Sequence, residues 1–103
     1  MLRVSLDILQ RYASIVHVDD PKVLGEIQRL ARLDRIVLTR HAVKRMDQRG
    51  AKRGDVRAAL VSATAAMAQD RGGWRVEGGS DRDGDELTVV IDLEADVIVI
   101  TLF

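Results

Sequence analysis

With 103 residues, of which 47% are hydrophobic and 31% charged, the chain is long enough for one hydrophobic core and too short for two. The absence of cysteine excludes disulfides, thiolate nucleophiles and cysteine-based metal sites, and two histidines are too few for a His-rich site, so we expect neither a metal nor a cofactor. No apolar run approaches the roughly 18 residues of a membrane helix, and no signal-peptide segment opens the chain, which predicts a cytoplasmic protein with no membrane partner.

The net charge of zero hides a segregation of charge along the chain. Residues 35–57 carry eight basic side chains against two acidic ones, a net charge of +6, which leaves −6 for the remainder. Carboxylates are concentrated in residues 77–96. The basic segment could attract phosphate groups, meet the acidic segment of a second copy in a homodimer, or form a solvated helix face.

The first third of the chain predicts a helical hairpin. Apolar residues recur at helical spacing over residues 5–16, and Asp20 with Pro21 is a start signal for a second helix that runs to about Leu33. We therefore divide the single domain 1–103 into this hairpin (1–34) and a core (35–103).

The core begins with a short strand and two helices. Ile36–Thr39 is rich in β-branched residues and predicts a strand. Thr39 can cap a helix over Arg40–Arg49 that stops at Gly50, and a second helix is predicted over Arg53–Ser62.

After residue 62 the hydrophobic period changes from 3.6 to 2. This alternation predicts four strands, at Ala65–Gln69, Trp74–Gly78, Glu86–Leu93 and Asp96–Phe103. The predicted fold class is thus α+β, an N-terminal helical hairpin and short helices packed on a C-terminal antiparallel β-meander of about four strands. The residues predicted to face the core are Leu87, Val89, Ile91 and Leu93 with Ile98, Ile100 and Leu102. The opposite face is also largely apolar, which favours a homodimer.

The helix predicted over residues 40–49 carries the residues best suited to chemistry. Helical geometry places His41 and Arg45 on one surface, with Arg49 beside them. Ala42, Val43 and Met46 are predicted to face the core. Histidine can take and give a proton near neutral pH, and arginine holds phosphate and stabilises developing negative charge. Together these groups suit cleavage of an RNA phosphodiester.

The string R-H-A-V-K-R-M-D-Q-R-G at 40–50, entered from a strand and followed by a meander that ends in V-I-V-I-T-L-F at 97–103, resembles a small bacterial domain family of unknown function. The resemblance covers about residues 35–103. That family is similar to the RelE, barnase and EndoU group of small ribonuclease folds, whose members occur as toxin domains. The resemblance implies that His41 is the acid/base and that Arg45 and Arg49 clamp phosphate. It also implies that the site is completed from the sheet by Thr101, with Thr88 or Arg75.

The sequence leaves two functions open. The first is a toxin-like ribonuclease that cuts RNA without a metal and is inhibited by a protein antidote. The second is a non-catalytic interaction module, in which the basic helix and the acidic hairpin mediate self-association or bind a protein partner. In the second case His41 caps or packs the helix start, and Arg45 or Arg49 pairs with the acidic strands.

Overall fold

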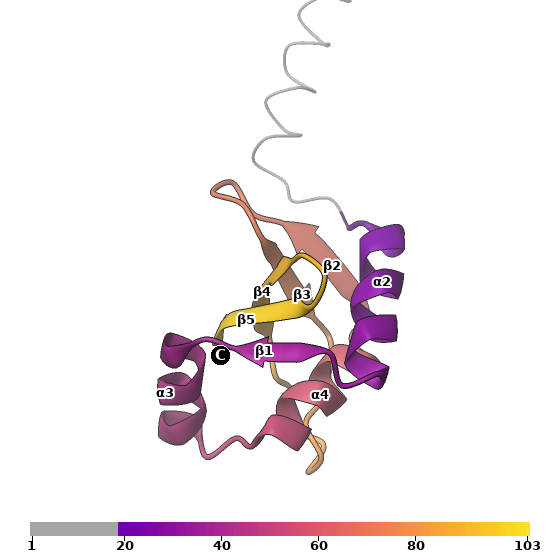
Figure 1. Cartoon of the computed structure of the whole chain (residues 1–103). Coiled ribbons are helices and arrows are strands. Elements are labelled where there is room, and N and C mark those ends of the chain that lie inside the picture. Colours follow the sequence, from indigo (N-terminus) through magenta and orange to yellow (C-terminus); the bar gives the residue numbers. More distant parts are fainter. Residues whose placement is uncertain (1–18) are drawn as a thin grey trace, which may run out of the picture.

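A computed structural model describes residues 19–103, which form three helices and five strands (Figure 1). The helices are α2 (Pro21–Arg32), α3 (Arg40–Arg49) and α4 (Arg53–Ser62). The strands are β1 (Ile36–Leu38), β2 (Ala65–Ala68), β3 (Trp74–Glu77), β4 (Val89–Leu93) and β5 (Val97–Leu102). The predicted α+β class is confirmed, while the helix predicted over residues 5–16 lies outside the described residues.

Helix α2 begins as its sequence predicts. The Asp20 carboxylate accepts hydrogen bonds from the backbone N–H groups of Lys22 and Val23, both at 3.1 Å, and Pro21 occupies the first helical position. The helix ends at Arg32, one residue before the predicted end. Its buried face consists of Ile27, Leu30 and Ala31.

The sheet is larger than predicted and is mixed rather than purely antiparallel. Its strand order is β1-β5-β4-β3-β2, and β1 joins it by pairing in parallel with β5, so that Ile36–Leu38 lies opposite Val97–Val99. The prediction of an antiparallel meander of about four strands was therefore incomplete. A parallel pair between segments about 60 residues apart leaves no local signal in the sequence, because no turn joins the two strands.

Strand β5 faces the core with residues that differ from those predicted. The buried residues are Val97, Val99 and Leu102, and the half-buried ones are Ile98 and Ile100. The prediction of an inward-facing Ile98 and Ile100 was wrong because the register shifts within the β4–β5 pair. Ile91 lies opposite Val99 and Val90 opposite Thr101, so Ile100 is an extra residue on β5. Such a bulge interrupts the strict alternation on which the prediction depended.

Strand β4 begins at Val89, three residues later than predicted. The preceding segment turns away toward the end of β3, where the backbone N–H of Leu87 donates to the carbonyl of Gly79 at 3.0 Å. Glu86 pairs with Ser80 in an isolated β-bridge outside the named strands. Residues 80–86 are thus a turn, in which the Asp81 carboxylate accepts hydrogen bonds from two backbone N–H groups.

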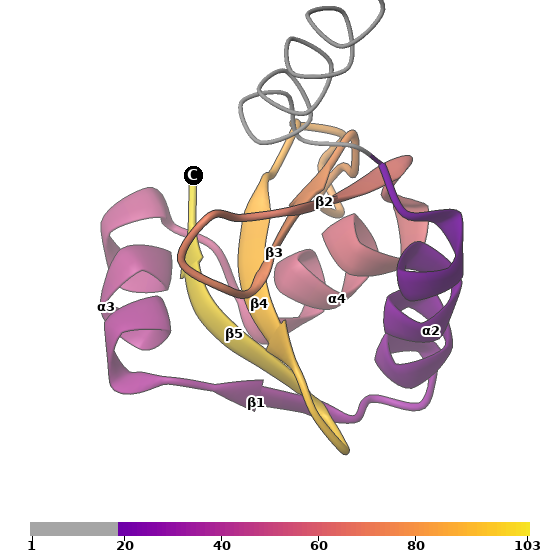
Figure 2. The same cartoon turned by 90° about the horizontal axis from the view of Figure 1, so that it is seen from above.

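Helices α2 and α4 pack together against one face of the sheet, and α3 lies apart from them beside β5 (Figures 1 and 2). The helices contribute Ala42 and Met46 from α3, Val56, Ala59 and Leu60 from α4, and the buried face of α2. The sheet contributes Ala66, Val76, Val89, Ile91, Val97, Val99 and Leu102. The strand residues that alternate with these point to the opposite face, which we call the outer face.

Asp55 joins the start of α4 to the turn at residues 80–86. It is buried, and its carboxylate accepts hydrogen bonds from the backbone N–H of Lys52 at 2.8 Å and from Nε of Arg82 at 3.0 Å. The side-chain hydrogen bond from Arg82 is the largest cause that lowers the pKa of Asp55 from 3.8 to about 2. The hydrogen bonds of the folded structure therefore stabilise the charged form of the Asp55 carboxylate.

We expect Asp55→Asn to make the stability of the protein less dependent on acid pH. The pKa of Asp55 is depressed in the folded state from 3.8 to about 2, so its contribution is present above the unfolded pKa and is lost as the pH falls through about 2. The difference in melting temperature between wild type and variant should therefore shrink between pH 5 and pH 2. Thermal denaturation at several pH values measures it. Asp47→Asn, on the exposed side of α3, is the control, and a difference that stays constant with pH would contradict the assignment.

Candidate functional site

Thr39 fixes the start of α3 against the sheet. Its Oγ1 accepts a hydrogen bond from the backbone N–H of Ala42 at 3.1 Å, and its hydroxyl donates to the carbonyl of Val99 at 2.8 Å. Gly50 ends the helix in the left-handed conformation, with φ of 73°. Both predicted ends of α3 are confirmed. Of its predicted core residues, Ala42 and Met46 are buried, but Val43 is 43% exposed and the prediction for it was wrong.

Helix α3 lies along the part of β5 that β1 does not cover. Strand β1 pairs only as far as Val99, which leaves the following carbonyls of β5 without a strand partner on that edge. Nε of Arg45 donates to the carbonyl of Leu102 at 3.2 Å, and Nη2 of Arg49 donates to the carbonyl of Glu86 at 2.7 Å. The guanidinium group of Arg45 is therefore held by the backbone of β5, and that of Arg49 by the backbone of the turn that precedes β4.

The charges of Arg45 and Arg49 are not neutralised by any carboxylate within residues 19–103. Five described arginines make ion pairs, and these two are not among them. Arg45 also donates to the side-chain oxygen of Gln48 at 3.1 Å, which still leaves one of its nitrogens without a partner. Arg49 is exposed and keeps Nε and Nη1 without a described partner. Both guanidinium groups can donate to an added anion.

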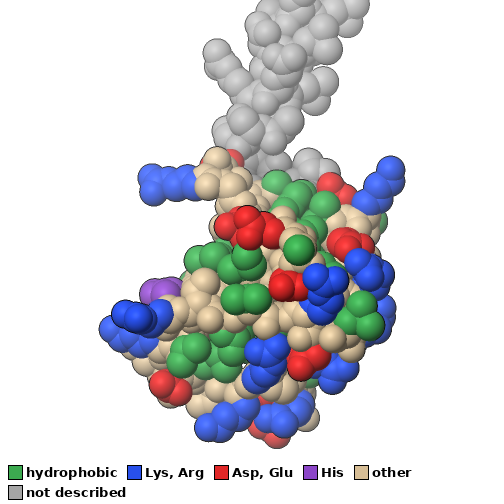
Figure 3. All heavy atoms as spheres, in the orientation of Figure 1, with side chains coloured by type: hydrophobic (Ala, Val, Ile, Leu, Met, Phe, Trp, Pro, Cys, Tyr) green, Lys and Arg blue, Asp and Glu red, His purple; other side chains and the backbone are tan. Residues whose placement is uncertain are grey.

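His41 is exposed and lies one helical turn before Arg45. Within the described part of the chain, its side chain makes no hydrogen bond or ion pair, and Thr39 rather than His41 caps the helix start. In Figure 3 a histidine lies at the left edge of the molecule, directly beside a cluster of Lys and Arg side chains. The imidazole is thus open to solvent in a positive surrounding.

Thr101 lies on the outer face, in a row of residues that crosses the sheet. It lies opposite Val90 on β4, which in turn lies opposite Arg75 on β3. The guanidinium carbon of Arg75 lies 5.6 Å from the centre of the Phe103 ring. Arg45 reaches the carbonyl of Leu102, directly after Thr101, so the structure brings these two predicted residues to the same end of β5. Thr88 is joined to Phe103 by backbone hydrogen bonds.

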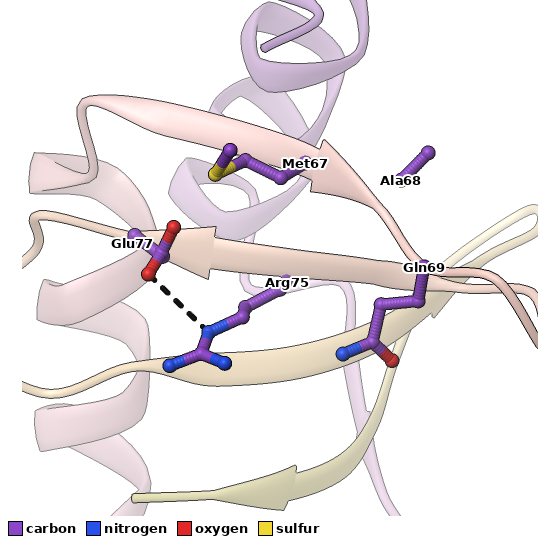
Figure 4. A pocket seen from close by; sticks show the side chains of 5 residues that line it. All are labelled: Met67, Ala68, Gln69, Arg75 and Glu77. Atoms are coloured by element: carbon purple, nitrogen blue, oxygen red, sulfur yellow. Dashed lines mark ion pairs between the residues drawn. The ribbon is translucent and has the colours of Figure 1, made fainter. Parts of the chain in front are cut away.

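A pocket of about 280 Å³ opens at the β2–β3 side of the outer face (Figure 4). Its lining residues are Met67, Ala68, Gln69, Arg75 and Glu77. Nε of Arg75 lies 3.3 Å from a carboxylate oxygen of Glu77. Of these residues the sequence singled out only Arg75, although the alternation along β2 and β3 already places Met67 and Glu77 on the same face.

The described residues contain neither a side-chain cluster suited to a metal ion nor a helix suited to cross a membrane. Nowhere in residues 19–103 do three His, Asp or Glu side chains come together in a way that could hold a metal ion. In the same range no helix has the length and apolar character needed to cross a membrane.

Comparison with known proteins gives a family match. The model of a family described as "Domain of unknown function (DUF4258)" matches residues 38–103, from the last residue of β1 to Phe103. No curated protein and no solved structure matches the chain. The matched range contains α3, α4 and the strands β2 to β5, and it leaves out α2.

Proposed function

The chain belongs to the DUF4258 family, and from that premise we propose that its domain is a small, metal-independent ribonuclease of the RelE, barnase and EndoU type. The supporting observation is the set of three groups on one side of α3, an imidazole without a partner and two guanidinium groups without a carboxylate among residues 19–103. In this proposal the domain acts as a toxin, and a protein antidote would cover the same surface.

His41 serves as the base and then as the acid. Its imidazole takes the proton of the ribose 2′-hydroxyl, and the oxygen attacks the adjacent phosphorus. The bond to the 5′-oxygen breaks, this leaving oxygen receives the proton from the imidazolium, and the product ends in a 2′,3′-cyclic phosphate. Arg45 and Arg49 donate their remaining N–H groups to the phosphoryl oxygens, whose negative charge increases in the transition state.

The anchoring of the two arginines supports this role. A guanidinium group held by a backbone carbonyl keeps its position without losing its charge, whereas one held by a carboxylate would be neutralised. Such preorganised donors act on developing charge without first having to reorganise. Thr101 and the exposed Phe103 ring extend the site onto the outer face, where an aromatic ring can stack on an RNA base.

Incubation of the purified protein with single-stranded RNA in EDTA tests the proposal. We expect cleavage that EDTA does not inhibit and that yields 2′,3′-cyclic phosphate ends. Because the interaction with phosphates is electrostatic, the activity should fall as the salt concentration rises. An RNA that stays intact at low salt would remove the ribonuclease proposal.

A second candidate function, a protein-interaction module, is favoured by the apolar character of the outer face. Val37 of β1 is 45% exposed and Phe103 48%, and Ile98 and Ile100 of β5 are half-buried. A second copy of the chain or a protein partner could cover this surface.

We expect an interaction through the outer face to give a dimer that persists at high salt. A dimer formed by the basic and acidic segments would instead dissociate as salt screens their charges. Sedimentation at low and high salt distinguishes the two. A monomer under both conditions would contradict self-association altogether.

A further inference from the structure

A second pocket lies away from α3, where the end of α2, the start of α4 and the turn at residues 80–86 meet. Its volume is about 380 Å³. Its lining residues are Arg32, Gly54, Arg57, Ala58, Val61 and Arg82. The lining thus combines three guanidinium groups from three separate elements with no carboxylate, and two apolar side chains complete it.

Two of the three arginine charges are uncompensated by any described carboxylate. Arg57 donates from Nε and Nη2 to the carbonyls of Ala31 and Arg32, both at 2.9 Å, so its guanidinium is held in place but keeps its charge. The Arg32 side chain makes no hydrogen bond or ion pair with residues 19–103. Only Arg82 is paired, with Asp55. Arg32 and Arg57 therefore bring positive charge to the pocket without an ion pair to any described carboxylate.

We propose that this pocket binds the phosphoryl group of a small phosphorylated ligand. A tetrahedral phosphoryl group presents three or more oxygens and can accept from three guanidinium groups that approach from different directions, whereas a planar carboxylate presents only two. Ala58 and Val61 offer an apolar surface to the remainder of the ligand. The site is separate from α3 and does not depend on the ribonuclease proposal.

A substitution of Gly54 tests the pocket sterically without removing any of the pocket's charges. A methyl group at this position would lie 2.9 Å from Cζ and Nη1 of Arg82, so the guanidinium would have to move. Gly54 lies in the first turn of α4 and does not need a left-handed backbone, so alanine is compatible with the helix. Gly54→Ala should therefore weaken binding by displacing Arg82.

Titration with inorganic pyrophosphate, followed by the NMR shifts of backbone amides, tests the proposal. We expect saturable shifts at residues 54, 58 and 82, separate from any shifts that pyrophosphate causes at the α3 arginines, and no saturation of these shifts with malonate. Arg32→Gln should reduce the affinity about tenfold or more, because it removes a charged donor. It breaks no side-chain contact of the described structure, so the fold should be retained.

Arg71→Gln is the matched control, since it removes an exposed arginine of the β2–β3 turn that likewise has no side-chain partner among the described residues, and it lowers the net charge by the same amount. Its affinity for pyrophosphate should equal that of the wild type. The proposal is overturned if pyrophosphate produces no saturable shifts at residues 54, 58 and 82, or if Arg71→Gln weakens binding there as much as Arg32→Gln. RNA cleavage should be unchanged in Arg32→Gln, so the two proposals fail separately.

Discussion

His41→Ala is expected to lower the rate of RNA cleavage by a factor of about 10² to 10⁴, the range for loss of a general acid or base. The exposed imidazole has no described partner, so its removal should leave the melting temperature unchanged. Initial rates on a defined oligonucleotide and thermal denaturation of both proteins measure the two effects.

Arg40→Ala is the matched control for this experiment. Arg40 is exposed and directly precedes His41, and its side chain likewise has no described partner. Its loss removes a positive charge near the site and should weaken RNA binding only modestly, in a manner that low salt restores. Equal cleavage by wild type and His41→Ala would show that the imidazole is not the acid or base.

The contacts of Arg45 and Arg49 explain how α3 can hold the proposed catalytic side chains in fixed positions. Each arginine uses one edge of its guanidinium group to attach the helix to the carbonyl of Leu102 or Glu86, and Thr39 attaches the helix start to β5. The same residues thus have a structural role and a proposed role in catalysis. Lysine, with a single ammonium group, could not supply both contacts in this geometry.

The elements whose signals are local in the sequence were predicted well. The bounds of α3 and α4 agree with prediction. Those of α3 follow from Thr39 as a cap and Gly50 as a stop, which act within one turn of the helix. The parallel pairing of β1 and the bulge at Ile100 were not predicted, because both depend on contacts between distant segments.

The candidate site residues likewise differ in whether their signal is local in the sequence. His41, Arg45 and Arg49 were found from their spacing on one helix. The pocket that contains Arg32, and the one that contains Gln69, were not found, because each is assembled from separate elements. The charge of Arg32 alone gives no sign that its pocket contains two further arginines.

Gly79→Ala is expected to produce the largest loss of stability, because the end of β3 passes close to the backbone of α4. A methyl group at this position would overlap the carbonyl oxygen of Ala59 and lie 2.7 Å from its carbonyl carbon. The obstacle is backbone, which cannot rotate away as a side chain can. Helix α4 would have to move, and the packing of Leu60 against the sheet would be disturbed.

We expect this substitution to lower the free energy of unfolding by about 3 kcal/mol or more, at the upper end of what overpacking costs. Gly25→Ala is the control, since this glycine lies on the exposed side of α2 with nothing within 4 Å of an added methyl group. There the same change should stabilise the protein by up to about 1 kcal/mol, because alanine favours a helix. Urea denaturation followed by circular dichroism should thus shift the two midpoints in opposite directions. A Gly79→Ala midpoint equal to that of the wild type would contradict the close approach of β3 to α4.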